Sequence, residues 1–400
     1  MSGSGLSQNR LDRLHGVMAG RIERGELSGL VTLISRRGET YVDAIGTMAV
    51  GGEPMRHDAI FRIASMTKPI TAVAAMILVE ECRLRLDDPV DGLLPELAGR
   101  RVLRRLDGPL DETVPAHRPI TLRDLLSFRM GFGMILGSPD EYPILRALEE
   151  RQIFVGPPQP ATPLTPDEWL RRLGELPLMD QPGERWRYDG GSLVLGVLID
   201  RAAGQSLGSF LHERIFAPLG MVDTAFYVPA HGRDRLPTCY AADPATGQRI
   251  VRDAAGGQWS QPPIFPNAAA GLVSTAGDYL AFGEMLLGQG RRGDARILSR
   301  PSVAAMTTDQ LRAGEKVAPD FFPGDPGTRG WGFGVAVVTK RDDPAASPGR
   351  FGWTGGYGTS AYVDPAEGLI GILMTQQEIT ELPPKIERDF WTAAYAAIDD

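Results

Sequence analysis

Within the first 45 residues, apolar and polar positions alternate with two different periods, one helical and one typical of strands. Apolar residues recur at helical spacing over about residues 8–25, which predicts an amphipathic helix that packs on a sheet. Two runs rich in β-branched residues follow at 30–35 and 41–45, and a polar stretch at 36–40 separates them. This arrangement predicts an antiparallel hairpin. The chain therefore opens with a helix and a hairpin.

The C-terminal third returns to β-rich runs, which predict strands at 331–338, 360–363 and 369–374. A helix over about residues 384–398 is expected to close the chain. Strands near both termini, with helices and loops between them, predict one sheet assembled from the two ends of the chain.

Two central stretches, 131–182 and 228–268, accumulate proline, glycine and aromatic residues without a clear period. They are expected to be long loops that shape a pocket. Loop aromatics more often pin their own loops, but five of them are candidates to line such a pocket: Tyr142, Trp259, Phe265, Phe321 and Phe322.

Residues 65–79 are apolar nearly all round, which predicts a buried helix. Pro69 fits only in the first turn of a helix, so this helix must begin close to Ser65. Ser65 and Lys68 then lie on one helical face, because residues at i and i+3 are neighbours. A serine hydroxyl needs a neighbour to accept its proton during attack. We expect burial and the helix end to lower the pKa of Lys68 so that its amine can act as that base.

The pattern S-x-x-K is weak alone, since a surface lysine following an N-cap serine also produces it. Two facts favour the catalytic interpretation. The pattern occurs only once in this chain, at the start of an apolar helix. In addition, only four of the 42 basic residues are lysines, so chance alone would rarely place a lysine at this position. The pair is a known alternative to a Ser-His-Asp triad.

Composition narrows the remaining possibilities. The 400 residues are 42% hydrophobic and 23% charged, as in a globular protein of one large composite domain or two intimate ones. A net charge of −8 argues against nucleic-acid binding. No apolar run approaches the ~18 residues of a membrane span, and the first residues lack the pattern of a signal peptide, so no membrane association and a cytoplasmic location are expected. The five histidines are scattered, no nucleotide motif is present, and no cofactor or metal is expected.

Four segments resemble, in order and rough spacing, the landmarks of the class C β-lactamase-like serine hydrolases: 65–68, 182–188, 271–278 and 352–358. Among these enzymes the sequence is most similar to the family VIII carboxylesterases, and the similarity covers nearly the whole chain. It implies an α+β fold with an antiparallel sheet flanked by helices. Residues 1–90 and 265–400 would form the sheet domain and 91–264 a mainly helical lobe, with the active site in the cleft between them.

The resemblance also implies residue roles. Ser65 would be the nucleophile, Lys68 its partner, and Tyr188 the group that relays protons during acylation and deacylation. The backbone N–H groups of Ser65 and Gly356 would form the oxyanion hole, because a tetrahedral intermediate needs donors aimed at its developing charge.

Three further residues are expected to contact the substrate: Gly190, Trp353 and Gly355. Many lactamases and peptidases of this superfamily have asparagine where Gly190 stands and lysine where Trp353 stands. The asparagine would hold an acylamino group and the lysine a carboxylate. A carboxylated β-lactam therefore loses both contacts, whereas a neutral ester loses neither and gains an apolar wall at Trp353. Gly355 lets a substrate approach its strand closely.

The sequence thus predicts a serine hydrolase that cleaves small, neutral, short-chain carboxylic esters. A small-amide or D-peptide hydrolase, a weak β-lactamase and an acyltransferase remain alternatives on the same fold. A non-catalytic binding protein is a third class, disfavoured because a binder has no need of a costly buried lysine. The natural acyl and alcohol groups and the oligomeric state are left open.

Overall fold

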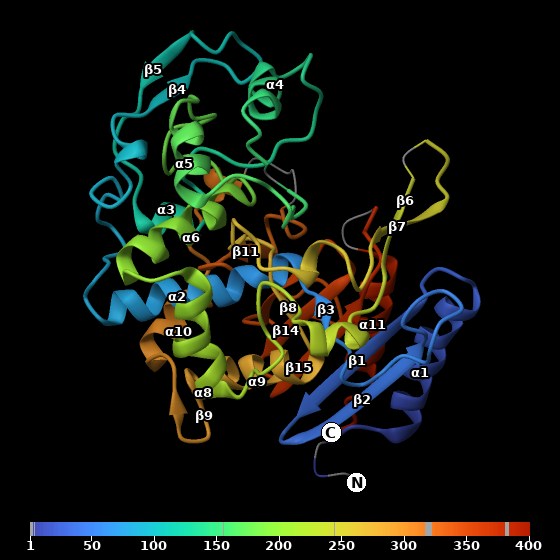
Figure 1. The fold of residues 1–400 in the computed structure, drawn as a ribbon. Helices are drawn as coiled ribbons and strands as arrows, with labels where there is room; N and C mark the ends of the chain where they lie inside the picture. Colours follow the sequence, from blue (N-terminus) through green and yellow to red (C-terminus); the bar gives the residue numbers. More distant parts are fainter. Residues whose placement is uncertain (1–2, 4, 155, 244, 317–321, 381–383) are drawn as a thin grey trace.

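A computed structural model describes residues 3, 5–154, 156–243, 245–316, 322–380 and 384–400 (Figure 1). Its centre is a seven-stranded antiparallel sheet in the order β11-β12-β13-β14-β15-β1-β2. The N-terminal hairpin of β1 (Gly29–Arg36) and β2 (Glu39–Gly46) joins the C-terminal strands where β1 pairs with β15 (Leu369–Thr375). The predictions of an opening hairpin and of a sheet built from both ends are confirmed.

Helices cover both faces of this sheet. On one face α1 (Gln8–Glu23) lies against α11 (Lys385–Ala396), and on the other lie α2 (Thr67–Glu80) and α9 (Ala276–Leu287). Strand β1 is buried along its whole length because its alternate side chains enter two separate cores. Leu30 and Ile34 pack in the core beneath α1 and α11, whereas Val31 and Leu33 pack in the core that contains α2.

The middle of the chain forms a helical lobe beside α2, at the upper left of Figure 1. Helix α6 (Gly190–Ala203) packs on α2, and α3 (Leu122–Leu126) and α5 (Pro166–Gly174) pack on α6. The remaining helices described are α4 (Pro143–Glu150), α7 (Leu207–Leu211), α8 (Ala217–Leu219) and α10 (Arg300–Met306). The proposed domain boundaries near residues 90 and 265 remain a prediction.

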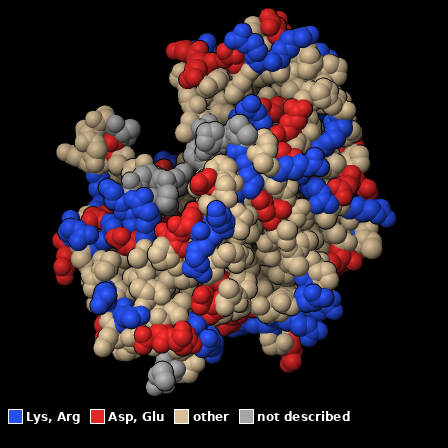
Figure 2. Space-filling model, turned by 180° about the vertical axis from the view of Figure 1, so that it is seen from behind, with Lys and Arg blue, Asp and Glu red and all other residues tan. Residues whose placement is uncertain are grey.

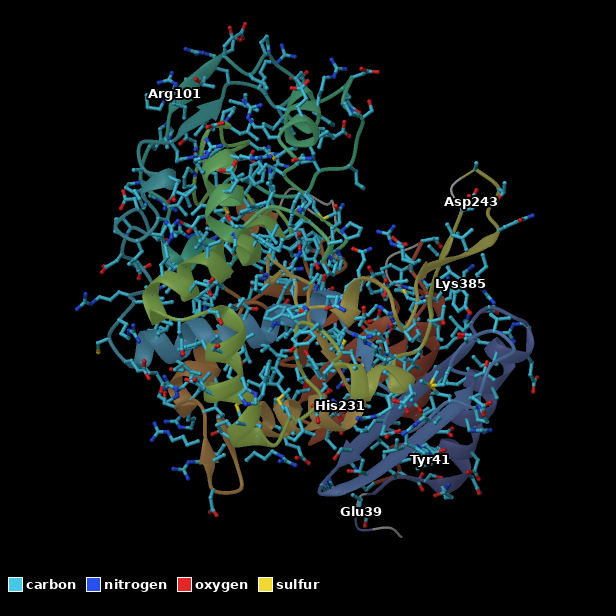
Figure 3. The ribbon with its side chains drawn as sticks, viewed as in Figure 1. Glu39, Tyr41, Arg101, His231, Asp243 and Lys385 are labelled. Carbon is cyan, nitrogen blue, oxygen red and sulfur yellow. The ribbon has the colours of Figure 1, made fainter. Side chains whose placement is uncertain are left out.

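Short strands complete the described structure. Two lie in the main sheet near the cleft, namely β13 (Phe351–Gly355) and β14 (Thr359–Asp364). Outside it, four pairs are formed by β3 (Phe61–Arg62) with β8 (Val273–Ser274), β4 (Arg101–Leu103) with β5 (Thr113–Pro115), β6 (Cys239–Ala242) with β7 (Arg249–Asp253), and β9 (Arg291–Arg292) with β10 (Ala295–Arg296). Arg101 lies on β4 at the far end of the helical lobe, and Asp243 marks the tip of the projecting β6–β7 hairpin (Figure 3).

The single strand predicted over 331–338 is wrong. The structure has two strands here, β11 (Arg329–Trp331) and β12 (Ala336–Val338), paired as a hairpin. The turn between them holds Gly334 at φ 72°, where a Cβ would lie 2.9 Å from the Lys68 carbonyl oxygen. Close packing on α2 and a left-handed backbone therefore both require glycine there, and they break the strand.

The two long loops predicted in mid-chain are also only partly correct. Helices α4 and α5 lie inside 131–182, and the β6–β7 hairpin lies inside 228–268. Ile144, Ala147 and Leu148 are buried at helical spacing in α4, so a helical period is present. These helices have only eight and nine residues, and the surrounding prolines and glycines obscure so short a pattern.

Candidate active site

Ser65 lies in a braced turn between β3 and α2. A 3₁₀ turn at Ala64–Met66 leads into α2, so the helix begins two residues after Ser65. Ala64 adopts φ 45°, a costly conformation for a residue with a side chain. Neighbouring groups hold the turn in place: the Ile63 N–H donates to the Leu272 carbonyl oxygen at 3.1 Å, and the Tyr279 hydroxyl donates to the Met66 carbonyl oxygen at 3.0 Å. The half-buried Ser65 hydroxyl is thus presented from a rigid segment.

The Lys68 ammonium is buried beside Ser65. Its Nζ donates to Ser65 Oγ at 3.0 Å and to the Ala269 carbonyl oxygen at 2.9 Å. A third neighbour is the carboxylate of Asp189, whose Oδ1 lies 2.6 Å from Nζ. The Lys68 side chain is 0% exposed and that of Asp189 3%. The structure confirms that helical spacing brings Ser65 and Lys68 together.

The expected lowering of the Lys68 pKa is wrong. Burial does lower this pKa, but the negative charge of Asp189 and the nearby Tyr188 raise it more, and the net pKa of Lys68 is raised. An amine with a raised pKa remains an ammonium at neutral pH. Lys68 is therefore a hydrogen-bond donor to Ser65 Oγ.

Tyr188 lies against Lys68 in an aromatic cluster. The Lys68 Nζ is 4.5 Å from the centroid of the Tyr188 ring, and the Trp353 indole N–H donates to the Tyr188 hydroxyl oxygen at 2.7 Å. An indole N–H can only donate, so the Tyr188 oxygen is the acceptor. The rings of Phe128, Trp186 and Trp331 pack around Tyr188 as well. A cation and a fixed hydrogen-bond donor therefore both contact Tyr188.

The end of β13 is clamped against the turn that carries Ser65. A Cβ on Gly355 would lie 2.3 Å from the Ile63 carbonyl oxygen, so no larger residue fits. The Thr359 hydroxyl donates to the same Ile63 oxygen at 3.1 Å. Gly356 comes next, with open space where its Cβ would be. This clamp fixes the backbone of Gly356 relative to Ser65.

A cavity of about 820 Å³ opens in front of these residues. Ser65, Tyr188, Trp353 and Gly356 line its floor. Its walls are mixed. Apolar side chains line one part of them, namely Met134, Leu136, Pro157, Pro158, Phe322 and Pro323, and charged side chains line another part, including Asp325, Arg329, Asp342, Arg350, Glu378 and Arg388. On the face of the protein shown in Figure 2, acidic and basic side chains are interspersed and no patch of one sign dominates.

A β-lactamase family model matches residues 14–395. The chain belongs to the β-lactamase family. Among its relatives, the protein Rv1367c of Mycobacterium tuberculosis is 40% identical over 88% of this chain and 87% of its own length. Esterase EstB of Burkholderia gladioli is 30% identical over 91% of this chain and 89% of its own. The solved structure of EstCE1, a hydrolase with promiscuous acyltransferase activity, superposes with a TM-score of 0.80 at 27% identity and covers 97% of this chain and 99% of that one.

Membership in the β-lactamase family, together with its esterase and acyltransferase relatives, makes this chain a member of a serine-hydrolase group. The fold, with its large antiparallel sheet and flanking helices, is that of β-lactamases and penicillin-binding proteins, as predicted. Within the described parts of the chain, no helix is long and apolar enough to cross a membrane.

Not every candidate residue lies at the cavity of this β-lactamase-family protein. Gly190 is packed beneath the Phe132–Gly133 backbone, where its Cβ would be 2.7 Å from the Phe132 carbonyl oxygen, and it is not among the lining residues. Its neighbour Asp189 lines the cavity and contacts Lys68 instead. Sequence reasoning missed Asp189, and an acidic side chain directly after Tyr188 was the available signal.

The aromatic candidates divide in a similar way. Phe322 lines the cavity, whereas Tyr142, Trp259 and Phe265 do not. Trp259, for example, is buried and donates its indole N–H to the Gly271 carbonyl oxygen at 3.0 Å, so it pins its own loop. Phe321 lies outside the described residues.

Proposed function

We propose that this protein hydrolyses small, neutral carboxylic esters with short acyl chains through a covalent acyl-enzyme on Ser65. The observation that carries the proposal is the hydrogen bond from the buried Lys68 ammonium to Ser65 Oγ, at the floor of a cavity that Tyr188 and Gly356 also line. A binding protein would gain nothing from burying this cation, which costs free energy unless it is paired.

In the proposed acylation step, Ser65 Oγ attacks the ester carbonyl carbon and its proton passes to the Tyr188 oxygen. The Lys68 ammonium and the Trp353 indole N–H stabilise negative charge on Tyr188 before that transfer. The N–H groups of Ser65 and Gly356 stabilise the oxyanion. When the tetrahedral intermediate collapses, the C–O bond to the alcohol breaks and Tyr188 returns the proton to the leaving alkoxide. Water then repeats the sequence and releases the acid.

The residues at positions 190 and 353 support a neutral substrate. Gly190 and Trp353 stand where family members often have an amide and a cation for acidic β-lactams, and Gly190 has no room for a side chain. We expect kcat/KM for p-nitrophenyl butyrate to exceed that for nitrocefin by orders of magnitude. Comparable values for the two substrates would contradict this preference.

The nucleophile is tested with Ser65→Ala. This variant should lose all but a trace of its esterase activity while its melting temperature stays near that of the wild type. The substitution removes one hydrogen bond, which contributes about 1 kcal/mol, and Lys68 keeps its contacts with Asp189 and the Ala269 carbonyl oxygen. Mass spectrometry of the wild type quenched during turnover should find the mass of one acyl group on the peptide that contains Ser65. Ser35→Ala on β1, far from the cavity, is the matched control. Activity in a clean Ser65→Ala preparation would refute the assignment.

Acyl transfer is a second candidate that specific observations favour. Acyltransferase calJ of Penicillium decumbens is 26% identical over 92% of this chain, and EstCE1 is described as promiscuous for acyl transfer. The cavity of about 820 Å³ lies in the range of ~300–1,000 Å³ that holds a drug-sized ligand, so an acceptor alcohol could lie beside the acyl group. The ratio of new ester to free acid, measured with an added alcohol, separates transfer from hydrolysis.

A further inference from the structure

Asp189, the residue after Tyr188, contacts both Lys68 and a segment that lines the cavity. Asp189 Oδ1 lies 2.6 Å from Lys68 Nζ, and Asp189 Oδ2 accepts the Gly156 backbone N–H at 3.1 Å. Gly156 lines the cavity. The two oxygens of one buried carboxylate thus hold the ammonium on one side and a wall segment on the other.

The backbone at Asp189 is in a conformation that few residues adopt. Its φ is 79° and its ψ −53°, and the Gly190 N–H donates to the Tyr188 carbonyl oxygen at 3.1 Å. This is a γ-turn with positive φ, a rare and strained geometry. Strain of this kind persists only where the surroundings enforce it, and it is concentrated at functional sites.

A capping role does not account for Asp189. It precedes α6 at the N-cap position, where aspartate commonly accepts a backbone N–H of the first helical turn. Here its side chain makes no such capping bond. Its carboxylate points instead to Lys68 and Gly156.

The charges around the Lys68 ammonium are few. Asp189 and Tyr188 are the titratable groups that act on it, both from the segment before α6. Ser65 Oγ, in the turn before α2, and the Ala269 carbonyl oxygen are its neutral hydrogen-bond partners in the described structure. Within the described structure, the carboxylate of Asp189 is therefore the negative charge that balances this buried cation.

We propose that Asp189 is a positioning residue that keeps Lys68 charged and aimed at Ser65 Oγ, so that the proton acceptor of this site is the Tyr188 oxygen and not the lysine amine. The inference rests on the proposed function. It adds that Asp189, to which the family resemblance assigned no role, decides which member of the Lys68–Tyr188 pair holds the proton.

The test is Asp189→Asn, which removes the charge and nearly preserves the shape. Asparagine has nearly the same size and shape as aspartate, so the turn should survive. Without the carboxylate, Lys68 gives up its proton more readily, and the form with charged lysine and ionised tyrosine becomes rarer. We expect kcat to fall roughly 10- to 100-fold with KM little changed, and the alkaline limb of the kcat profile to move to lower pH by about one unit or more.

Two further variants show whether the charge is responsible. Asp189→Glu retains the charge and should keep the alkaline limb near its wild-type position even if the rate falls. Asp180→Asn is the matched control, because Asp180 lies in the same segment and pairs with Arg187 and Arg185 without contacting Lys68. Its pH profile should be that of the wild type.

A readout independent of activity is available because the chain has only four lysines: Lys68, Lys316, Lys340 and Lys385. Selective isotope labelling of lysine should give four side-chain NMR signals, with Lys68 assigned by its loss in Lys68→Arg. The Lys68 signal should titrate above the ordinary lysine range in the wild type and at lower pH in Asp189→Asn.

Two results would overturn the inference. An unchanged Lys68 titration in Asp189→Asn would mean that the carboxylate does not set its charge. A faster Asp189→Asn enzyme, with its acid limb moved to lower pH, would mean that the free amine of Lys68 is the base. Neither result depends on the acyl-enzyme experiment with Ser65→Ala, so a failure of the proposed hydrolase function would be seen separately.

Discussion

The hydrogen bond from the Trp353 indole to the Tyr188 oxygen can be removed with little change of shape by Trp353→Phe. The bond is 2.7 Å long, and both residues are less than 10% exposed. Phenylalanine keeps an aromatic ring against Tyr188 but has no N–H. If Tyr188 accepts the proton of Ser65, the variant loses a donor that stabilises the reactive, ionised form.

The expected size of the effect follows from this contact. A hydrogen bond to a charged group contributes ~1.5–3 kcal/mol. Since about 1.4 kcal/mol changes a rate tenfold, kcat at neutral pH should fall roughly 10- to 100-fold.

Trp331→Phe is the matched control. The Trp331 ring packs on Trp353 with centroids 4.8 Å apart, and its own indole N–H is buried with no hydrogen-bond partner in the described structure. The same loss of ring volume then removes no bond to Tyr188. Rates of p-nitrophenyl butyrate hydrolysis from acid to alkaline pH, with melting temperatures, compare the two variants. Equal losses of kcat in the two variants would refute the reasoning.

Three further outcomes are expected. Lys68→Ala and Tyr188→Phe should each lower kcat by orders of magnitude. The double variant should be hardly slower than either single variant, because the effects of residues that act as a unit are not additive. Losses of kcat that multiply in the double variant would mean that the two residues act independently. Glu387 is buried, and burial raises its pKa from 4.5 to about 7. The folded state therefore binds more protons than the unfolded state between these two values, and the free energy of unfolding should fall by up to about 3 kcal/mol as pH rises through them. Glu387→Gln should lack this slope in urea unfolding; a wild type with no slope would show that Glu387 is not shifted. Arg62→Met should lower the free energy of unfolding by about 3–5 kcal/mol, because it leaves the buried Asp253 carboxylate without its ion-pair partner. Asp253 Oδ2 lies 2.9 Å from Arg62 Nε. An unchanged melting temperature would contradict this.

The features that the sequence predicted correctly are set by local patterns. The hairpin of β1 and β2 follows from two short β-rich runs with a polar turn, and the position of Ser65 at a helix start follows from Pro69 and the apolar run behind it. Each depends on residues close together in the chain. The pairing of β1 with β15 could be expected only from the presence of strands at both ends.

The features that were missed depend on contacts between distant residues. Gly334 breaks a strand because it packs on the Lys68 carbonyl. Trp353 was expected as an apolar wall, and that role stays a prediction, but its N–H also bonds to Tyr188 from another part of the chain. Gly190 was expected at the substrate, yet the Phe132 carbonyl fills the space beside it. None of these partners can be identified from spacing along the sequence.

The protonation state of the site is the clearest case, because the motif S-x-x-K permits two opposite chemistries. Asp189 biases Lys68 toward its charged form, and Trp353 donates a hydrogen bond to the Tyr188 oxygen. In the proposed mechanism Lys68 must still hold its proton when Tyr188 accepts that of Ser65. Asp189→Asn should therefore move the upper edge of the active pH range to lower pH. A mechanism with a neutral Lys68 base predicts instead that Asp189→Asn extends activity on the acid side of the profile.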